Sequence, residues 1–282
     1  MALPVEWMAL TGDQLVQART AAAGVCLIPI GVLERHSTHL PTGTDVYEAD
    51  AVAKATAARE YAVVLPPMPY SVNDSSSNCP GAIDLPFRVL FDFYQGLFDE
   101  VARNGFNKIV LINFHGGNRS LLPALLSEHK CRPDAHYDLY LPDPAPWSAP
   151  DAVALCHAES DWHAGELETS LIQHLRPDLV DCAAFPAHAT LPRPNYPLAG
   201  ANTSLDWVAS FPDHYAGNAP LASAEKGAKI LEAIAIHLAR VLQDIKADTL
   251  TPALREEFRR QRLSPAVLRR AEPQPSRAKP AQ

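Results

Sequence analysis

Short apolar runs alternate along the chain with longer segments of helical periodicity. The apolar runs span residues 25–30, 61–65, 108–113 and 137–141. Continuous runs of this length are typical of strands that are buried on both faces of a parallel sheet. Because helical segments separate them, the pattern predicts an α/β fold: an open, mostly parallel sheet with helices on both faces.

Three segments between and after these runs have the pattern of helices. Residues 47–60 are rich in alanine, and residues 87–103 and 224–246 carry apolar stripes. The first stripe consists of Val89, Leu90, Phe93, Leu97 and Val101, and the second of Ile230, Ile234, Leu238, Val241 and Ile245. Stripes with this spacing predict amphipathic helices that pack on the sheet. The proline-rich segment 142–150 predicts a surface loop within one domain.

Composition excludes several classes of protein. The 282 residues carry a net charge of −8, and no basic run occurs in the first 240 residues, which argues against a nucleic-acid partner. No apolar run suggests a membrane span, and the start lacks the pattern of a signal peptide, so we expect no membrane partner and a cytoplasmic location. The five cysteines are odd in number and form no C-x-x-C pair, so neither a disulfide framework nor a thiolate zinc site is indicated.

The end of the chain differs from the rest in charge. Residues 249–282 contain seven Arg, one Lys and three acidic residues, a net charge of +5, which leaves −13 for residues 1–248. We therefore expect one domain over 1–248 and a basic, proline-containing tail over 249–282. The final residues, AEPQPSRAKPAQ, predict disorder.

Ionisable residues gather directly after the first predicted strand. Segment 34–45 contains Glu34, His36, His39 and Asp45. In an open α/β sheet, ligands bind outside the carboxyl ends of the strands, where these side chains would emerge. Two carboxylates and an imidazole there suit a divalent metal. The alternative is a polar loop in which Asp45 caps the next helix.

A second histidine follows the third predicted strand. In the segment NFHGGN at 113–118, we expect Gly116 and Gly117 to allow a turn with positive φ that directs His115 into the site. A glycine-rich turn with an exposed histidine is the alternative. The position at a second strand end favours the site.

A third cluster, DWHAGELETS at 161–170, opens a segment with a helical pattern. Glu166 and Glu168 are two residues apart, so on a helix they diverge by about 200° and cannot both face one site. If Gly165 lies in a loop, Glu166 could bind a metal and Glu168 could bond backbone amides at the helix start. A solvated acidic turn is the alternative.

Together these segments are similar to the signatures of the creatininase (creatinine amidohydrolase) family. The motifs are ExHxxHLPxGTD at 34–45, NxHGGN at 113–118 and HAGExETS at 163–170, with weaker matches at 79–85 and 222–227. The resemblance covers about residues 25–242. It implies a single-domain α/β hydrolase with two divalent metal ions (Zn²⁺, Mn²⁺ or Fe²⁺), commonly assembled as a hexamer.

The resemblance also implies the metal ligands by position. They would be Glu34, His36, Asp45, His115 and Glu166. Asp45 would bridge the two ions, with Glu34 and His115 completing one site. His36 and Glu166 would complete the other.

Some positions depart from the pattern of creatininase itself. That enzyme has its last ligand glutamate at the position of Gly117 and a valine at the position of Glu166, which argues against creatinine as the substrate. Arg35 stands where the family usually has glutamine and could pair with a substrate carboxylate, although a surface salt bridge is equally consistent. Phe114 and Trp162 could form walls of the substrate pocket, beside Gly116 and Gly117, or could belong to the core.

His163 is the candidate for proton transfer. An imidazole near the metals can protonate a departing nitrogen, and its pKa near 7 suits that step. Alternatively, His163 orients Glu166.

The sequence therefore predicts a metal-dependent hydrolase in which a metal-activated water attacks a carbonyl. The expected reaction opens a cyclic amide (lactam) or another non-peptide C–N bond of a small molecule. A formamide deformylase and a peptide-processing enzyme of cofactor maturation are alternatives within the family, and a non-catalytic metal-binding or scaffold protein is the alternative from another class. A homo-oligomer is expected from the resemblance.

Overall fold

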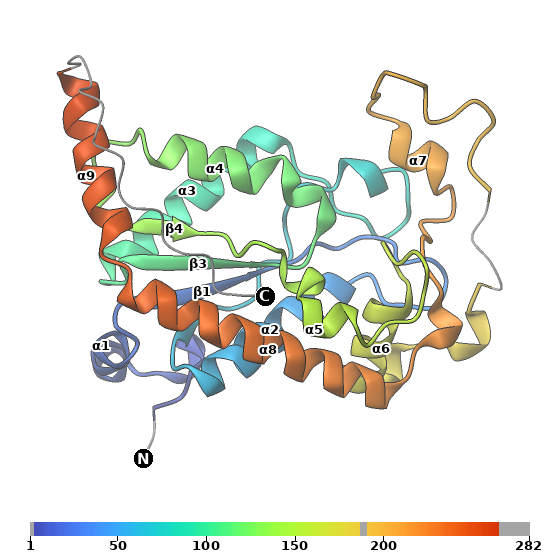
Figure 1. Cartoon of the computed structure of the whole chain (residues 1–282), viewed down its shortest axis with the longest axis horizontal. Helices are drawn as coiled ribbons and strands as arrows, with labels where there is room; N and C mark the ends of the chain where they lie inside the picture. Colours follow the sequence, from blue (N-terminus) through green and yellow to red (C-terminus); the bar gives the residue numbers. More distant parts are fainter. Residues whose placement is uncertain (1–2, 187–190, 265–282) are drawn as a thin grey trace, which may run out of the picture.

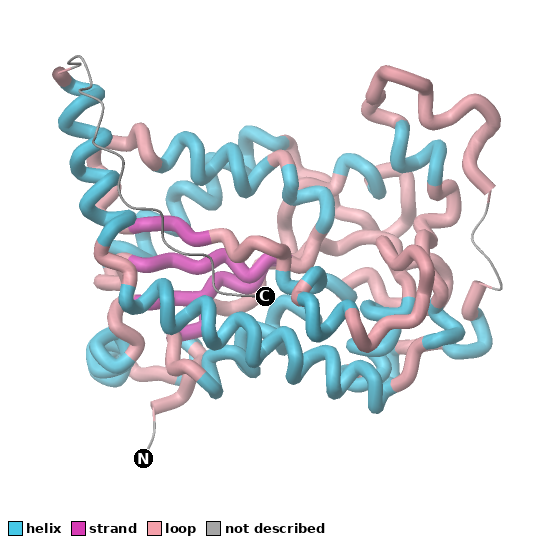
Figure 2. The backbone as a smooth tube through the Cα atoms, in the orientation of Figure 1, coloured by secondary structure: helices cyan, strands magenta, loops and turns pink. Residues whose placement is uncertain are grey.

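A four-stranded parallel sheet forms the centre of the computed structural model, which describes residues 3–186 and 191–264. Its strands are β1 (Val25–Ile30), β2 (Val63–Val64), β3 (Lys108–Asn113) and β4 (Asp138–Tyr140). They lie in the order β2-β1-β3-β4 and are all parallel. Figure 2 shows the strands side by side in magenta, with helices around them. Each strand falls within one of the four apolar runs, so the predicted α/β fold is confirmed.

Helices cover both faces of the sheet (Figure 1). One face packs against α2 (Thr44–Arg59), α5 (Pro150–Val153), α6 (Glu166–Leu175) and α8 (Ala224–Ala247). The other packs against α3 (Phe87–Arg103) and α4 (Leu121–His129), and α1 (Gly12–Ala21) joins that core. Successive side chains of a strand point to opposite faces, so Val25 and Leu27 enter the first core while Cys26 and Ile28 enter the second.

The apolar stripe of α3 differs from the prediction. Its buried face contains Leu90, Tyr94 and Phe98, whereas Val89 and Phe93 are 53% and 46% exposed. Val89 and Phe93 each precede a buried residue by one position, which turns them about 100° away on the helix. The predicted stripe is therefore correct at Leu90, Leu97 and Val101 and wrong at Val89 and Phe93. Spacing alone included these two because the neighbouring row of the helix is also apolar. The α8 stripe is buried as predicted at Ile230, Ile234, Leu238 and Ile245.

Part of the predicted tail is helical. α9 (Leu250–Leu263) lies at the amino end of the sheet, where the Arg255 guanidinium is 2.7 Å from the Asp138 carboxylate (Figure 1). The segment 265–282, which includes the predicted disordered end, lies outside the described residues. The loop 142–150 carries only a short 3-10 turn before α5. No helix in the described ranges is long and apolar enough to cross a membrane.

The strand order fixes where a ligand can bind. After β1 the chain continues toward α2 on one face, and after β3 it continues toward α4 on the other. Neighbouring strands whose connections diverge in this way leave a crevice at their carboxyl ends. Segments 34–45 and 113–118 both begin at this crevice.

Candidate metal centre

The segment after β1 is pressed closely against the start of α2. A Cβ on Gly31 would lie 2.6 Å from the carbonyl carbon of Asp45, so only glycine fits at this approach. Glu34, His36 and Asp45 are buried, with exposed fractions of 1–3%. The helix cap is Gly43, and no side chain caps it. Asp45 is therefore not a capping residue, and the polar-loop alternative is wrong.

Asp45 lies between two histidines from different segments. Its Oδ1 is 2.8 Å from His36 Nε2, and its Oδ2 is 2.9 Å from His115 Nδ1. Among the described residues, His36 Nε2 and Asp45 Oδ2 nevertheless have no hydrogen-bond partner, because these contacts are not aligned as hydrogen bonds. The nitrogen and oxygen atoms that could bind a metal lie within 4.8 Å of one another in each group that includes Asp45. Such a set fits a divalent cation that would be held by imidazole and carboxylate.

His115 is held by the turn after β3. Asn113 Oδ1 accepts hydrogen bonds from the backbone N–H of His115 and from Asn118 Nδ2, at 3.2 and 2.8 Å. The predicted positive φ at Gly116 and Gly117 is wrong, since neither is among the residues with positive φ. Gly117 is required for a different reason: a Cβ there would lie 2.4 Å from His115 Nε2. The histidine is buried and directed at Glu34, whose Oε1 is 3.0 Å from its Nδ1.

The first glutamate of the third motif does not reach the cluster, whereas the second does. Glu166 Oε2 accepts hydrogen bonds from the backbone N–H groups of His157 and Ala158, both at 2.7 Å, and its Oε1 pairs with the Lys226 ammonium. Glu168 Oε2 accepts a hydrogen bond from the backbone N–H of Ala164 at 2.5 Å, as expected, and it also lies 3.8 Å from His36 Nε2. The expected divergence of the two side chains is present, but Glu166 is turned away from the cluster. Lys226, sixty residues along the chain, supplies the cation that holds it there.

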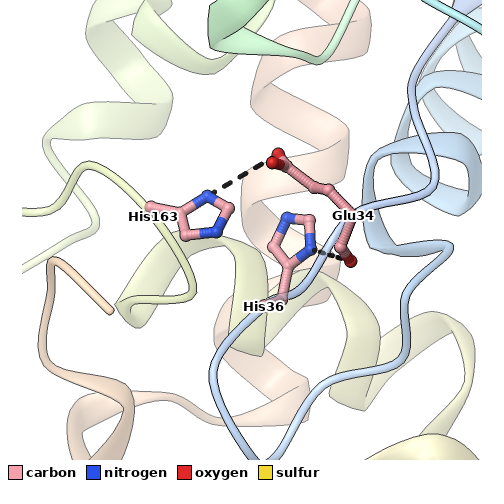
Figure 3. A group of neighbouring side chains, drawn as sticks. All are labelled: Glu34, His36 and His163. Atoms are coloured by element: carbon pink, nitrogen blue, oxygen red, sulfur yellow. Dashed lines mark hydrogen bonds and ion pairs between the residues drawn. The ribbon is translucent and has the colours of Figure 1, made fainter. Parts of the chain in front are cut away.

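His163 reaches the cluster from the loop before α6. Its Nε2 lies 2.9 Å from the carbonyl oxygen of Arg35 and donates a hydrogen bond to it, and its Nδ1 is 3.9 Å from Glu34 Oε1. Figure 3 shows the rings of His163 and His36 beside each other next to the Glu34 carboxylate. Three groups of ligand atoms in the described residues lie close enough to hold a metal: Glu34, His36 and His163; Glu34, Asp45 and His115; His36, Asp45 and Glu168.

Burial and opposite charges act against each other in this cluster. Burial would raise the pKa of Glu34, but His115 and His163 outweigh it and hold the pKa well below its usual range. Burial would lower the pKa of His36, but Asp45 outweighs it and raises the pKa to about 10. Burial raises the pKa of Glu168 to about 8. Without a metal, His36 and His115 therefore keep protons that a divalent cation could replace, whereas burial lowers the pKa of His163 to about 4.

A cavity of about 590 Å³ opens onto the cluster. Four of the residues expected at the substrate line it: Phe114, Gly116, Gly117 and Trp162. The fifth, Arg35, is not among the lining residues, because its Nε donates to the carbonyl oxygen of Ser37 in its own loop. The prediction that Arg35 contacts the substrate is therefore corrected.

Two further walls were missed from sequence. Trp147 and Trp207 line the same cavity, the first from the proline-rich loop and the second from α7 (Asp206–Ser210). Neither lies in a periodic segment or a recognised motif. The size of these aromatic side chains was the only signal in the sequence that could have indicated a role at the cavity.

The comparisons with known proteins identify the family. The chain belongs to the creatininase family: residues 9–242 match the family model described as creatinine amidohydrolase. It is 30% identical over 268 residues to the creatinine amidohydrolase of Pseudomonas putida, which covers 86% of this chain and 93% of the relative. It is 34% identical over 161 residues to the mycofactocin precursor peptide peptidase of Mycolicibacterium smegmatis, which covers 54% of this chain and 58% of the relative.

Solved creatininase structures share the fold. The crystal structure of creatinine amidohydrolase (creatininase) is 25% identical, with a TM-score of 0.73 over 88% of this chain and 100% of that one. Creatininase is known in an Mn structure (26% identity, TM-score 0.69, 90% and 98% of the chains) and, as a mutant, in a Zn–Zn form (26%, 0.69, 91% and 99%).

Proposed function

We propose that this chain is a metal-dependent hydrolase whose two-metal centre is held by Glu34, His36, Asp45, His115 and Glu168. One observation carries the proposal: two groups of ligand atoms share Asp45, and each carboxylate oxygen of Asp45 faces a different histidine. A bridging carboxylate requires this arrangement. Glu168 takes the place that the sequence had given to Glu166.

The residues around the centre fit carbonyl hydrolysis. When bound, two divalent ions at such a centre lower the pKa of a water molecule and polarise the substrate carbonyl. His163 donates its Nε2–H to the Arg35 carbonyl, which leaves the lone pair of Nδ1 directed toward the cluster. The pKa near 7 that was expected for His163 is wrong, because burial lowers the pKa to about 4 and leaves Nδ1 unprotonated at neutral pH. The fixed tautomer allows Nδ1 to accept a proton during the reaction and to deliver it to the departing nitrogen.

The cavity favours a small substrate. Its volume lies within the range of about 300–1,000 Å³ that is usual for small-molecule sites, and its walls include the aromatic rings of Phe114, Trp147, Trp162 and Trp207. Two relatives cover most of both chains: a creatinine amidohydrolase, named for a cyclic amide, at 30% identity, and a 3-dehydro-scyllo-inosose hydrolase at 23%. The peptidase matches about half of each chain. We therefore infer hydrolysis of a non-peptide C–N bond, most favourably in a cyclic amide.

Metal analysis of two matched variants tests the ligand set. Glu168→Gln and Glu166→Gln remove the same charge from the first turn of the same helix. We expect the wild type to bind two Zn²⁺ or Mn²⁺ ions per chain, Glu168→Gln to bind about one, and Glu166→Gln to keep two. If Glu166→Gln loses an ion and Glu168→Gln does not, the ligand assignment is wrong.

Activity separates the enzyme from a metal-binding scaffold. A panel of lactams, formamides and short peptides should yield turnover on a cyclic amide. His163→Ala should lower kcat by about 10²–10⁴-fold with unchanged metal content, as expected for loss of a proton-transfer group. Full metal content without turnover on any member of the panel would contradict the enzymatic proposal.

Assembly and location stay predictions. A homo-oligomer, a hexamer by family resemblance, is tested by size-exclusion chromatography with light scattering, and a monomer would remove it. The cytoplasmic location is tested by fractionation of the source cells.

A further inference from the structure

One oxygen of the Glu34 carboxylate, the one that does not face His115 and His163, is held by a hydrogen bond from Ser76. Ser76 Oγ donates a hydrogen bond to Glu34 Oε2 at 2.7 Å, and His214 Nδ1 lies 3.1 Å from the same hydroxyl. All three side chains are buried. Glu34 Oε1, by contrast, faces His115 and His163. The two oxygens of one carboxylate therefore serve different neighbours.

The hydrogen bonds of this group have a defined direction. A serine hydroxyl has a single hydrogen, and Ser76 gives it to the carboxylate. His214 must then donate its Nδ1–H to the Ser76 oxygen. The result is a chain of two hydrogen bonds from the imidazole through the hydroxyl to Glu34, in which each bond strengthens the other.

The two residues come from segments that the sequence analysis did not assign to the site. Ser76 ends a 3-10 turn at Asp74–Ser76, which follows β2, and His214 lies after α7. His214 has a φ of 51°, a left-handed conformation that is uncommon for residues other than glycine. Trp207, in the same segment 206–214, lies edge-on to the ring of His163 at 5.6 Å. The segment 206–214 thus supplies both a wall of the cavity and the imidazole that contacts the Ser76 hydroxyl.

We propose that Ser76 and His214 are positioning residues that fix Glu34 Oε2, so that Oε1 is presented to the metal held with Asp45 and His115. This inference rests on the proposed two-metal function. It predicts an asymmetric effect, because Ser76 and His214 contact neither His36 nor Glu168 through any hydrogen bond of the described residues. Loss of either positioning residue should weaken one metal site and spare the other.

The variants separate the effect of losing a side chain from the effect of disturbing the left-handed backbone at His214. Ser76→Ala removes the hydroxyl. His214→Gly removes the ring in a residue that tolerates positive φ, and His214→Asn places an amide N–H near the position of Nδ1 and also tolerates this conformation. Ser77→Ala is the matched control, since Ser77 is exposed and its hydroxyl bonds only the Asp74 carbonyl.

The measurement is the affinity of each variant for Zn²⁺, by competition with a chromophoric chelator, with circular dichroism to confirm folding. Partners that orient metal ligands typically contribute about 10–100-fold in metal affinity. We expect one of the two ions to bind about 10–100-fold more weakly in Ser76→Ala and His214→Gly. His214→Asn should recover most of the affinity, and Ser77→Ala should match the wild type.

Distinct outcomes would overturn the inference. Folded Ser76→Ala and His214→Gly variants that bind both ions as the wild type does would overturn it alone and leave the proposed function intact. Equal weakening of both ions, with no recovery in His214→Asn, would show a general structural role and overturn it as well. A wild-type chain that binds no ions would overturn the proposed function and this inference together.

Discussion

The two ends of the sheet both bury charge, but they treat it in opposite ways. At the amino end, Lys108 is the first residue of β3 and is 8% exposed. Its ammonium donates to the carbonyl oxygens of Ile245, Lys246 and Asp248 at 2.7–2.8 Å. These carbonyls lie at the end of α8, where the helix dipole favours a cation. All three protons of Lys108 are used.

At the carboxyl end, one buried carboxylate lacks such partners. Glu48, one turn after Asp45 on α2, is 1% exposed, and neither of its oxygens has a hydrogen-bond partner in the described part of the chain. Burial raises its pKa well above the usual value, and the nearby carboxylates of Glu168 and Asp45 raise it further. Glu48 is therefore a buried carboxyl group to which the described residues supply neither a cation nor a hydrogen-bond donor.

The comparison separates charge that stabilises the fold from charge that serves a site. Buried polar groups are nearly always satisfied in native proteins. Among the described residues, guanidinium nitrogens of Arg255 and Arg259 at the amino end also lack hydrogen-bond partners, but the unpartnered atoms at the carboxyl end are carboxylate oxygens and imidazole nitrogens, which are metal ligands. Divalent cations are the partner that the carboxyl end fits. Three substitutions or conditions test the contrast between the two ends.

The largest effect is expected for Asp45→Asn. The substitution removes the charge that both histidines face, so both ions should be lost and kcat/KM should fall by about 10³-fold or more, since a polarising metal contributes several kcal/mol. Metal analysis and steady-state kinetics measure the two effects. The variant should remain folded by circular dichroism, because the other acids lose a repelling neighbour. Unchanged metal content would show that Asp45 does not bridge.

Lys108→Met should have the opposite profile. It leaves one buried and two partly buried carbonyl groups without their charged donor, so the free energy of unfolding in urea should fall by about 3 kcal/mol. Metal content and KM should stay at wild-type values. Lys229→Met, an exposed lysine on α8, is the control and should change stability by no more than about 0.5 kcal/mol. A loss of metal in Lys108→Met would contradict the separation of the two ends.

A smaller effect is expected at pH values below 6.5. His129, on α4, donates from Nε2 to the Tyr137 carbonyl at 2.7 Å, and burial lowers its pKa to about 4. Between pH 6.5 and 4 the unfolded chain binds more protons at this residue than the folded chain, so its contribution is complete above pH 6.5 and is lost as the pH falls. After allowance for partial solvent screening, we expect the free energy of unfolding to fall by about 2 kcal/mol.

The pH effect can be isolated with His129→Gln, which keeps a donor near the position of Nε2 but does not titrate. The difference in unfolding free energy between wild type and variant should change by about 2 kcal/mol between pH 7 and pH 4, while the rest of the titration cancels. A constant difference over this range would show that His129 does not titrate as expected.

Local patterns in the sequence were sufficient for the frame of the molecule. The apolar runs predicted four parallel strands, because a strand buried on both faces must be apolar at every position. Glu34, His36, Asp45 and His115 could be placed together, since each follows the carboxyl end of a strand in a segment with a recognisable motif. The periodicity of α3 was less informative, because Val89 and Phe93 are apolar yet exposed.

The sequence by itself thus determined the fold class, the end of the sheet that carries the site and most of the proposed ligands. It also determined that Glu166 and Glu168 point in different directions, because that follows from helix geometry. Only the tertiary structure decided which of them faces the cluster, since the choice depends on Lys226 of α8. It likewise brought His214 to Ser76 across 138 residues. Such pairs leave no trace in local periodicity, because packing between distant segments creates them.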